Sequence, residues 1–364
     1  MAVAEGLRRR PQVATASAGL LMLVVAVAIG PGSARTFWPA WLLAHSFWLH
    51  LALGALLAWL VHALTGGGWG QETRRHWRAA TGALPLLALF AVPLAFGLES
   101  LFPWAGESRA EVTWHGHQQV WLQPGWHRLR LALILIAWLC VAAAAGAFTR
   151  DDDPRPARRA ATIGLLVLAA TITLWCVDWL LALQMTGNTT MIGFTTMAGQ
   201  FAGGIALGML AERVRVGASP TDDDRRRLQD LGNLLLAAIS FHAYVFYMDF
   251  LIVWQGNLPH EVHWYLARAD GGGRAVALAL VATHLVVPFV ILLSRSAKRS
   301  PRVVVWAAIS VLVGRMLHAV WDVLPAVERG RLLPTAGIAL LLAAGIGTIL
   351  LAGLLARRGE EGGT

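Results

Sequence analysis

The sequence predicts an all-α, polytopic membrane protein, and three properties of the chain support this fold class. Hydrophobic residues make up 57% of the 364 residues and charged residues 14%, whereas soluble domains carry about 25% charged residues. Apolar runs long enough to cross a bilayer recur along the chain. Many of the 17 tryptophans stand at the ends of those runs, as in the aromatic belts of membrane proteins.

A transmembrane helix needs about 20 apolar residues, and ten runs approach that length. They cover residues 13–31, 37–63, 79–98, 129–149, 160–183, 191–211, 231–254, 275–294, 303–324 and 333–356. The first run follows three arginines, like a signal peptide, but it is long for one and no clear cleavage motif follows. We therefore expect it to be retained as the first helix.

The distribution of basic residues predicts the orientation. The N-terminus, the even-numbered loops and the C-terminus hold 21 Lys or Arg residues, and the odd-numbered loops hold 8. Since cytoplasmic loops carry the excess of basic residues, both termini are expected in the cytoplasm. The net charge of +9 is then explained by topology, and we expect membrane lipid but no nucleic acid as a partner.

Two loops on the predicted outer side, 99–127 and 255–274, are rich in Trp and His instead of the Ser and Gly of flexible linkers. We expect them to lie on the membrane surface or beneath an extrinsic partner subunit. The candidate partner contacts are Trp254, Asn257, Pro259, Glu261, Trp264 and Tyr265.

Ionisable residues inside the apolar runs are the candidate functional residues, because a charge at the bilayer centre costs about 2.5–3.5 kcal/mol. Arg315, His318 and Asp322 follow at i, i+3 and i+7, so they share one helix face, as do His242 and Asp249. We expect Arg315 to pair with Asp249 or with Asp178. The remaining candidates are the mid-helix histidines His50 and His284.

Histidine can hold or release a proton near neutral pH, so these eight residues are predicted to form a proton path. Three other interpretations stay open: interhelical hydrogen bonds with one buried ion pair, a bis-histidine haem b, and a quinone held between His and Asp. Cys140 and Cys176 cannot build a metal cluster, and no C-x-x-C-H motif attaches haem. The sequence predicts no metal and no cofactor in this chain.

The ten runs are expected to form one membrane domain over residues 1–364. Runs within 37–183 and within 191–324 would form two four-helix bundles, with 13–31 and 333–356 as peripheral helices. A faint internal echo supports the repeat, because 175–183 and 318–326 each place an Asp beside a Trp. A secondary transporter with two helical repeats is an alternative class, although such proteins have broken helices at matching positions, and no clear pair of them is visible.

Several stretches resemble a known family in their order along the chain. They are DLGNLLLAAISFHAYVFYMDFLIVWQGNLPHEVHWYLAR (230–268), HALTGGGWG (62–70), LPLLALFAVPLAFG (84–97), VDWLLAL (177–183) and KRSPRVVVWAAISVLVGRMLHAVWDVLPA (298–326). The chain resembles the ActF-type, smaller NrfD-like membrane subunit of bacterial alternative complex III, a quinol:cytochrome c or quinol:electron-carrier oxidoreductase. It departs from that family at 184–193, which reads QMTGNTTMIG where a Glu-Pro-His-Trp-Tyr-Ser run is usual.

The resemblance implies a ten-helix fold beside a larger NrfD-like membrane subunit, with an iron–sulfur subunit and haem c subunits on the outer face. It implies an accessory role that anchors these redox subunits and contributes a proton path. Haem c and iron–sulfur clusters would then belong to the partners, a quinone would lie nearby, and quinol oxidation would be the activity of the assembled complex.

Overall fold

The computed structural model describes residues 2–29, 34–106, 117–148, 154–184, 191–217, 219–269, 272–328 and 330–361. Within these ranges every element is helical. Nine helical segments are long and apolar enough to cross a membrane: Ala34–Thr65, Arg74–Ala95, Pro124–Ala147, Arg155–Leu183, Ile192–Val216, Asp222–Gly256, Gly273–Leu293, Pro301–Ala326 and Leu332–Leu355. The predicted class, an all-α multi-pass membrane protein, is confirmed.

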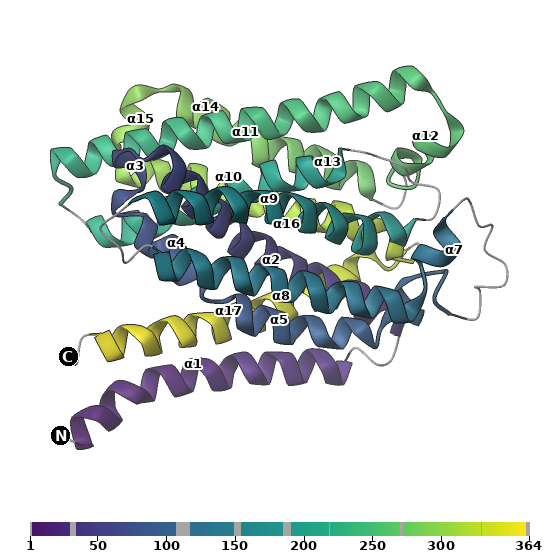
Figure 1. The fold of residues 1–364 in the computed structure, drawn as a ribbon, viewed down its shortest axis with the longest axis horizontal. Helices are drawn as coiled ribbons and strands as arrows, with labels where there is room; N and C mark the ends of the chain where they lie inside the picture. Colours follow the sequence, from purple (N-terminus) through teal and green to yellow (C-terminus); the bar gives the residue numbers. More distant parts are fainter. Residues whose placement is uncertain are drawn as a thin grey trace.

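The first predicted run, 13–31, lies in α1 (Ala2–Ile29), whose apolar part, Val13–Ala28, is shorter than a full span. Helix α1 packs along α17 (Leu332–Glu361). Figure 1 shows the two helices side by side at the lower edge of the molecule, with both chain termini at the same end.

Helix α2 (Ala34–Thr65) is the most buried of the nine spans, with 72% of its apolar window inside the protein. It packs against α10 (Ile192–Val216), α17, α9 (Pro154–Trp179) and α4 (Arg74–Thr81). The contact with α10 is made at two glycines, because a Cβ added at Gly54 or at Gly204 would collide with the backbone of the other helix. The small residues of 199–208 therefore permit close helix packing.

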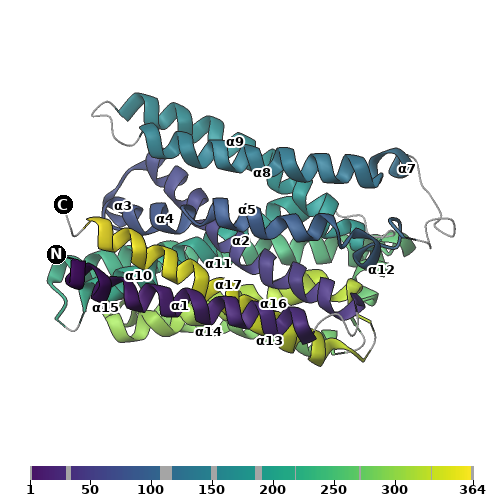
Figure 2. The same ribbon diagram turned by 90° about the horizontal axis from the view of Figure 1, so that it is seen from below.

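Helix α4 continues into α5 (Leu84–Ala91) and the short η2 (Val92–Ala95) to make one interrupted span. Helices α8 (Pro124–Phe148) and α9 pack on each other. Figure 2 shows them as a pair along one edge of the molecule.

The remaining spans are α11 (Asp222–Gly256), α16 (Pro301–Val323) and an interrupted helix made of α13 (Gly273–Val281), the π-helical η5 (Ala282–Val286) and α14 (Val287–Leu293). Helix α11 begins nine residues before the predicted run, because Thr221 and Asp224 form a capping box that starts it early.

Short helices close the two ends of the molecule. They are α3 (Gly68–Gln71), α6 (Leu98–Leu101), α7 (Gln118–Trp121), η4 (Leu181–Leu183), α12 (Pro259–Leu266), α15 (Arg295–Arg299) and η6 (Leu324–Ala326). Figure 1 places α7 and α12 at the end opposite the chain termini, so the two loops predicted to share one side do so. The middle of the first loop, 107–116, lies outside the described residues.

Candidate functional site

Six of the eight predicted polar-path residues are almost completely buried in the region where α2, α10, α11, η5 and α16 meet. We call them the polar cluster: His50, His242, His284, Arg315, His318 and Asp322, with exposed fractions of 2–4%. The expectation that ionisable side chains of the spans face the protein interior is confirmed for these residues.

Three imidazoles of the cluster are in direct contact. The ring centroids of His242 and His284 are 4.6 Å apart, and those of His242 and His318 are 5.4 Å apart. Phe246 lies one turn further along α11 and packs on the His318 ring at 5.8 Å. The edge-to-face contact of His242 and His284, with an interplanar angle of 74°, leaves no room for a porphyrin between them, so a haem b held by this pair does not fit.

His318 and Asp322 form the one carboxylate–imidazole contact of the cluster. Nδ1 of His318 lies 3.0 Å from Oδ2 of Asp322, one turn along the same helix. This contact fixes the orientation of the ring, and Nε2 of His318 stays buried with no hydrogen-bond partner among the described residues. The same is true of Nε2 in His50 and in His242.

His284 lies in a widened helical turn. The π-helical segment Ala282–Val286 is followed by Pro288, which has no N–H to bond the His284 carbonyl four residues earlier. Single π turns are frequent at functional sites. Gly314 of α16 faces this turn, because a Cβ added there would lie 2.5 Å from the Cβ of His284. The glycine thus lets α16 bring its polar face up to the histidine.

Arg315 is the exceptional member of the cluster. Its side chain lies against α10 at Gly199 and Gly203, where an added Cβ would meet it. Nε, Nη1 and Nη2 are all buried with no hydrogen-bond partner among the described residues. Asp322 is the nearby carboxylate that acts on it electrostatically. The expected ion pair of Arg315 with Asp249 or Asp178 is wrong, because both carboxylates have other partners.

Asp178 is held by α8 and α7. Arg130 donates from Nε to Oδ2 at 2.7 Å and from Nη2 to Oδ1 at 3.0 Å, and Trp121 donates to Oδ1 at 2.9 Å. The guanidinium also stacks on the Trp121 ring, 4.2 Å from its centroid. Both oxygens of Asp178 are therefore engaged in a clamp between helices, which the sequence missed because Arg130 appeared only as a basic residue at a helix end.

Asp249 is half-buried and accepts a hydrogen bond from the Tyr265 hydroxyl at 2.9 Å. Burial raises the pKa of Tyr265, and the neighbouring Asp249 carboxylate raises it further. The phenol therefore remains a donor throughout the neutral range. This bond ties the end of α11 to α12, so Asp249 has a local partner outside the polar cluster.

Arg268 was not predicted as a site residue, yet it is buried beside the C-terminal end of α16. It donates to the carbonyls of Trp321 at 2.9 Å and Trp264 at 2.8 Å, and to Oε1 of Gln184 at 3.1 Å. Its guanidinium lies 3.4 Å from the centroid of the Trp264 ring. A basic residue in a loop gives no signal of burial, so only the folded chain reveals it.

Burial lowers the pKa of Arg268 to about 9, and the nearby Asp322 opposes that shift. The guanidinium therefore stays protonated at neutral pH. It places a positive charge at the Asp322 end of the polar cluster.

The predicted partner contacts divide into two groups. Trp254, Asn257 and Pro259 are exposed, and Asn257 adopts a left-handed conformation (φ 46°) that ends α11. Trp264 is buried under Arg268, and Tyr265 and Glu261 are half-buried. Contacts within the chain therefore order this loop.

No group of three or more His, Cys, Asp or Glu side chains within the described ranges is arranged to hold a metal ion. Comparison of the chain with protein-family models and with curated proteins finds no match. The candidate site is thus defined by its own geometry: a buried group of four imidazoles, one carboxylate and one guanidinium.

Proposed function

We propose that this chain is an accessory membrane subunit of a quinol-oxidising electron-transfer complex of the alternative complex III type, and that its polar cluster conducts protons. The observation that carries the proposal is the convergence of His50, His242, His284 and His318 with Asp322 and Arg315 inside a membrane protein. The sequence resemblance supports the class of complex, and the geometry of the polar cluster supports a proton-conducting role within it.

The cluster has the chemistry of a proton relay. Imidazole exchanges protons near neutral pH, and buried chains of Asp, Glu and His mark proton relays in membrane proteins. Nε2 atoms of His50, His242 and His318 are free to give or accept a hydrogen bond. Since His318 is oriented by Asp322 and its ring lies against His242, the relay would run from Asp322 through His318 and His242.

Asp178 and Asp249 are left out of this path, because each carboxylate has a partner elsewhere. Arg315 would set the electrostatic potential of the relay.

The proposal includes the finer architecture that the resemblance implies: ten crossings with α1 as the first, both termini in the cytoplasm, and two four-helix bundles. Packing of α1 on α17 and the position of both termini at one end support an even number of crossings. A larger NrfD-like subunit would pack beside this chain, and the iron–sulfur and haem c subunits would cover the end that carries α7 and α12.

The transporter alternative is weaker. Two spans are interrupted in the described residues, Arg74–Ala95 between α4 and α5 and Gly273–Leu293 at η5. If the chain consisted of two repeats of four helices, Arg74–Ala95 would be the second helix of the first repeat. Gly273–Leu293 would be the third helix of the second repeat. Transporter repeats break at corresponding positions, so this pair does not favour alternating access.

The proposal is tested first by extraction from native membranes in a mild detergent, followed by purification through a tag on this chain. We expect haem c and iron–sulfur subunits to copurify and the assembly to oxidise quinol. A chain that purifies alone with its full activity contradicts the proposal.

The proton path is tested in the assembly with Asp322→Asn and His318→Gln. We expect quinol-driven proton translocation in proteoliposomes to fall about tenfold or more, since positioned proton-transfer groups contribute about 10²–10⁴-fold. Asp249→Asn makes the same exchange outside the cluster and should leave translocation unchanged. Equal translocation in all three variants would remove the polar cluster from the mechanism.

A further inference from the structure

A groove of about 1330 Å³ lies between α2, α4–α5, α8, α10 and α17, and none of the predicted site residues lines it. Small side chains keep it open where larger ones would close it. They are Ala52, Ala79, Ala80, Gly82, Ala83, Ala142, Ala143, Gly146, Gly208, Ala211 and Gly353. The break between α4 and α5 lies along the groove. Polar residues of α4 therefore line one part of it, and apolar residues of α5 line another.

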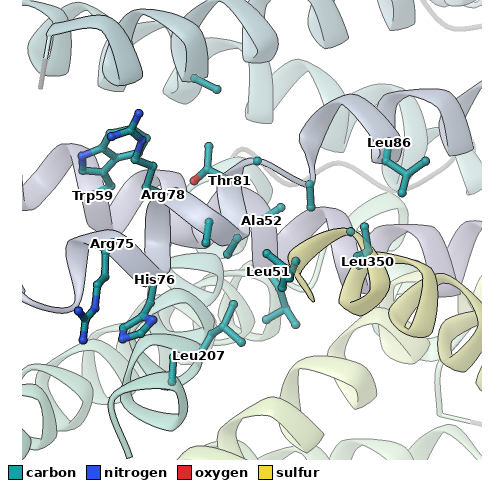
Figure 3. Close-up of a pocket in the computed structure, with 18 of the residues that line it drawn as sticks. Leu51, Ala52, Trp59, Arg75, His76, Arg78, Thr81, Leu86, Leu207 and Leu350 are labelled. Atoms are coloured by element: carbon teal, nitrogen blue, oxygen red, sulfur yellow. The ribbon is translucent and has the colours of Figure 1, made fainter. Parts of the chain in front are cut away.

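The lining of the groove changes in character along its length. Arg75, His76 and Arg78 stand at one end, with Trp59 and Thr81 beside them, as the left half of Figure 3 shows. Most of the remaining wall is aliphatic, with Leu51, Leu86, Leu139, Leu207, Ile349, Leu350 and Leu354. Arg215 also lines the groove, but its guanidinium is already paired with Glu212 and Asp224. A ligand that fills the groove therefore needs a polar end and a long apolar part.

The polar end has hydrogen-bonding capacity that the chain itself does not use. Trp59 is 2% exposed and Thr81 3% exposed, and neither Nε1 of Trp59 nor Oγ1 of Thr81 has a hydrogen-bond partner among the described residues. A buried donor without a partner costs about 1–3 kcal/mol. Arg78 is exposed beside them, and the nearest acid to Arg75 is Glu72 at 3.7 Å. Both of these polar atoms are covered by protein, so the groups at this end that a ligand in the groove can reach are the exposed guanidiniums of Arg75 and Arg78.

We infer that this groove binds one anionic phospholipid, with the phosphate beside Arg75 and Arg78 and the acyl chains along the aliphatic wall. The volume exceeds the roughly 300–1,000 Å³ of pockets for small ligands, which favours a lipid. Basic pockets between transmembrane helices on the cytoplasmic side bind anionic headgroups, and the positive-inside pattern assigns this end to the cytoplasm. A neutral quinone ring would leave Arg78, which has no ion-pair partner among the described residues, without a counter-ion.

The test is native mass spectrometry of the detergent-purified protein, titrated with dioleoyl phosphatidylglycerol and, separately, with dioleoyl phosphatidylcholine. We expect one tightly bound phosphatidylglycerol per chain and weaker binding of phosphatidylcholine, which has the same acyl chains without net charge. Each of Arg75→Gln and Arg78→Gln should weaken phosphatidylglycerol binding about fivefold, in line with the usual contribution of one basic residue near an anionic surface.

Arg74→Gln is the matched control, because it removes the same charge from the same helix at a residue that does not line the groove. It should leave the affinity unchanged.

Three results would overturn the assignment. Equal affinity for the two lipids would show that the headgroup charge is not recognised. Equal loss in Arg74→Gln and Arg78→Gln would reduce the effect to general surface charge. Displacement of the bound lipid by decylubiquinone or by inorganic phosphate alone would reassign the groove to a quinone or to a free anion.

Discussion

Asp178 and Asp322 are both buried carboxylates near the ends of membrane-spanning helices, and each stands beside a Trp in sequence, yet the fold treats them differently. Asp178 receives three hydrogen bonds, two of them from Arg130 on the neighbouring helix. Asp322 receives one, from a histidine of its own helix, and the guanidinium of Arg315 lies nearby without hydrogen-bonding to it.

Asp178 and Arg130 therefore form a structural ion pair, whereas Asp322 belongs to a site with unused hydrogen-bonding capacity. A buried charge with all its partners in place holds two helices together, and removing one partner is costly. A group of titratable residues with free ring nitrogens can change its protonation without breaking the fold. The same residue type in the same sequence context thus takes a structural role in one half of the chain and a candidate functional role in the other.

The largest expected effect comes from breaking the clamp. Arg130→Met would leave the Asp178 carboxylate buried without its cation and should lower the free energy of unfolding by about 3–5 kcal/mol. Chemical unfolding in detergent, followed by tryptophan fluorescence, measures it. Arg128→Met is the control, since that side chain is exposed and donates only to the Ala95 carbonyl. Recovery of stability in Arg130→Met/Asp178→Leu would confirm that the unpaired carboxylate causes the loss.

The second-largest effect is expected at Arg268, which lies over one end of the polar cluster. Arg268→Gln removes the guanidinium that donates to the carbonyls of Trp264 and Trp321. We expect the free energy of unfolding to fall by about 3 kcal/mol, since hydrogen bonds to charged groups contribute about 1.5–3 kcal/mol each. Arg268→Lys should not restore it, because an ammonium cannot reproduce the fork or the stacking on Trp264. Proteolysis of the 259–274 segment together with thermal unfolding detects the change. Full stability in the Lys variant would contradict this role.

Arg315→Met should act in the opposite direction from Arg130→Met. Since no nitrogen of Arg315 has a hydrogen-bond partner in the described chain, replacing the buried cation with an apolar side chain of similar length should raise the free energy of unfolding by about 1–3 kcal/mol. The same unfolding measurement applies to both variants. A loss of stability as large as that of Arg130→Met would show that Arg315 has a full counter-ion, and the contrast between the two sites would fail.

The smallest effect concerns the third carboxylate. Tyr265→Phe removes the hydrogen bond to Asp249 and should cost about 1 kcal/mol. Because the folded chain raises the pKa of Tyr265, the stability that this hydroxyl contributes is complete below the ordinary tyrosine pKa of about 10 and is lost at higher pH. The difference between wild type and variant should be constant from about pH 6 to 9 and shrink above 10. A difference that changes between pH 6 and 9 would assign the effect to another group.

Part of the site could be read from helical spacing. Residues 315, 318 and 322 share one face of a helix by their spacing, and their burial follows from the cost of exposing charge to lipid. Which carboxylate meets which cation could not be read, because Arg130 and Asp178 are 48 residues apart and belong to different helices. The buried Arg268 was missed for the same reason, since its four acceptors come from three separate segments.

The sequence by itself determined that this is a helical membrane protein, where most of its spans lie and which residues must avoid lipid, because hydrophobic length and the cost of buried charge are properties of each segment alone. Only the tertiary structure decided that Asp178 closes an ion pair with Arg130, that His242 touches both His284 and His318, and that small residues leave a groove beside α2. These depend on which helix faces come together, and packing between distant segments sets them.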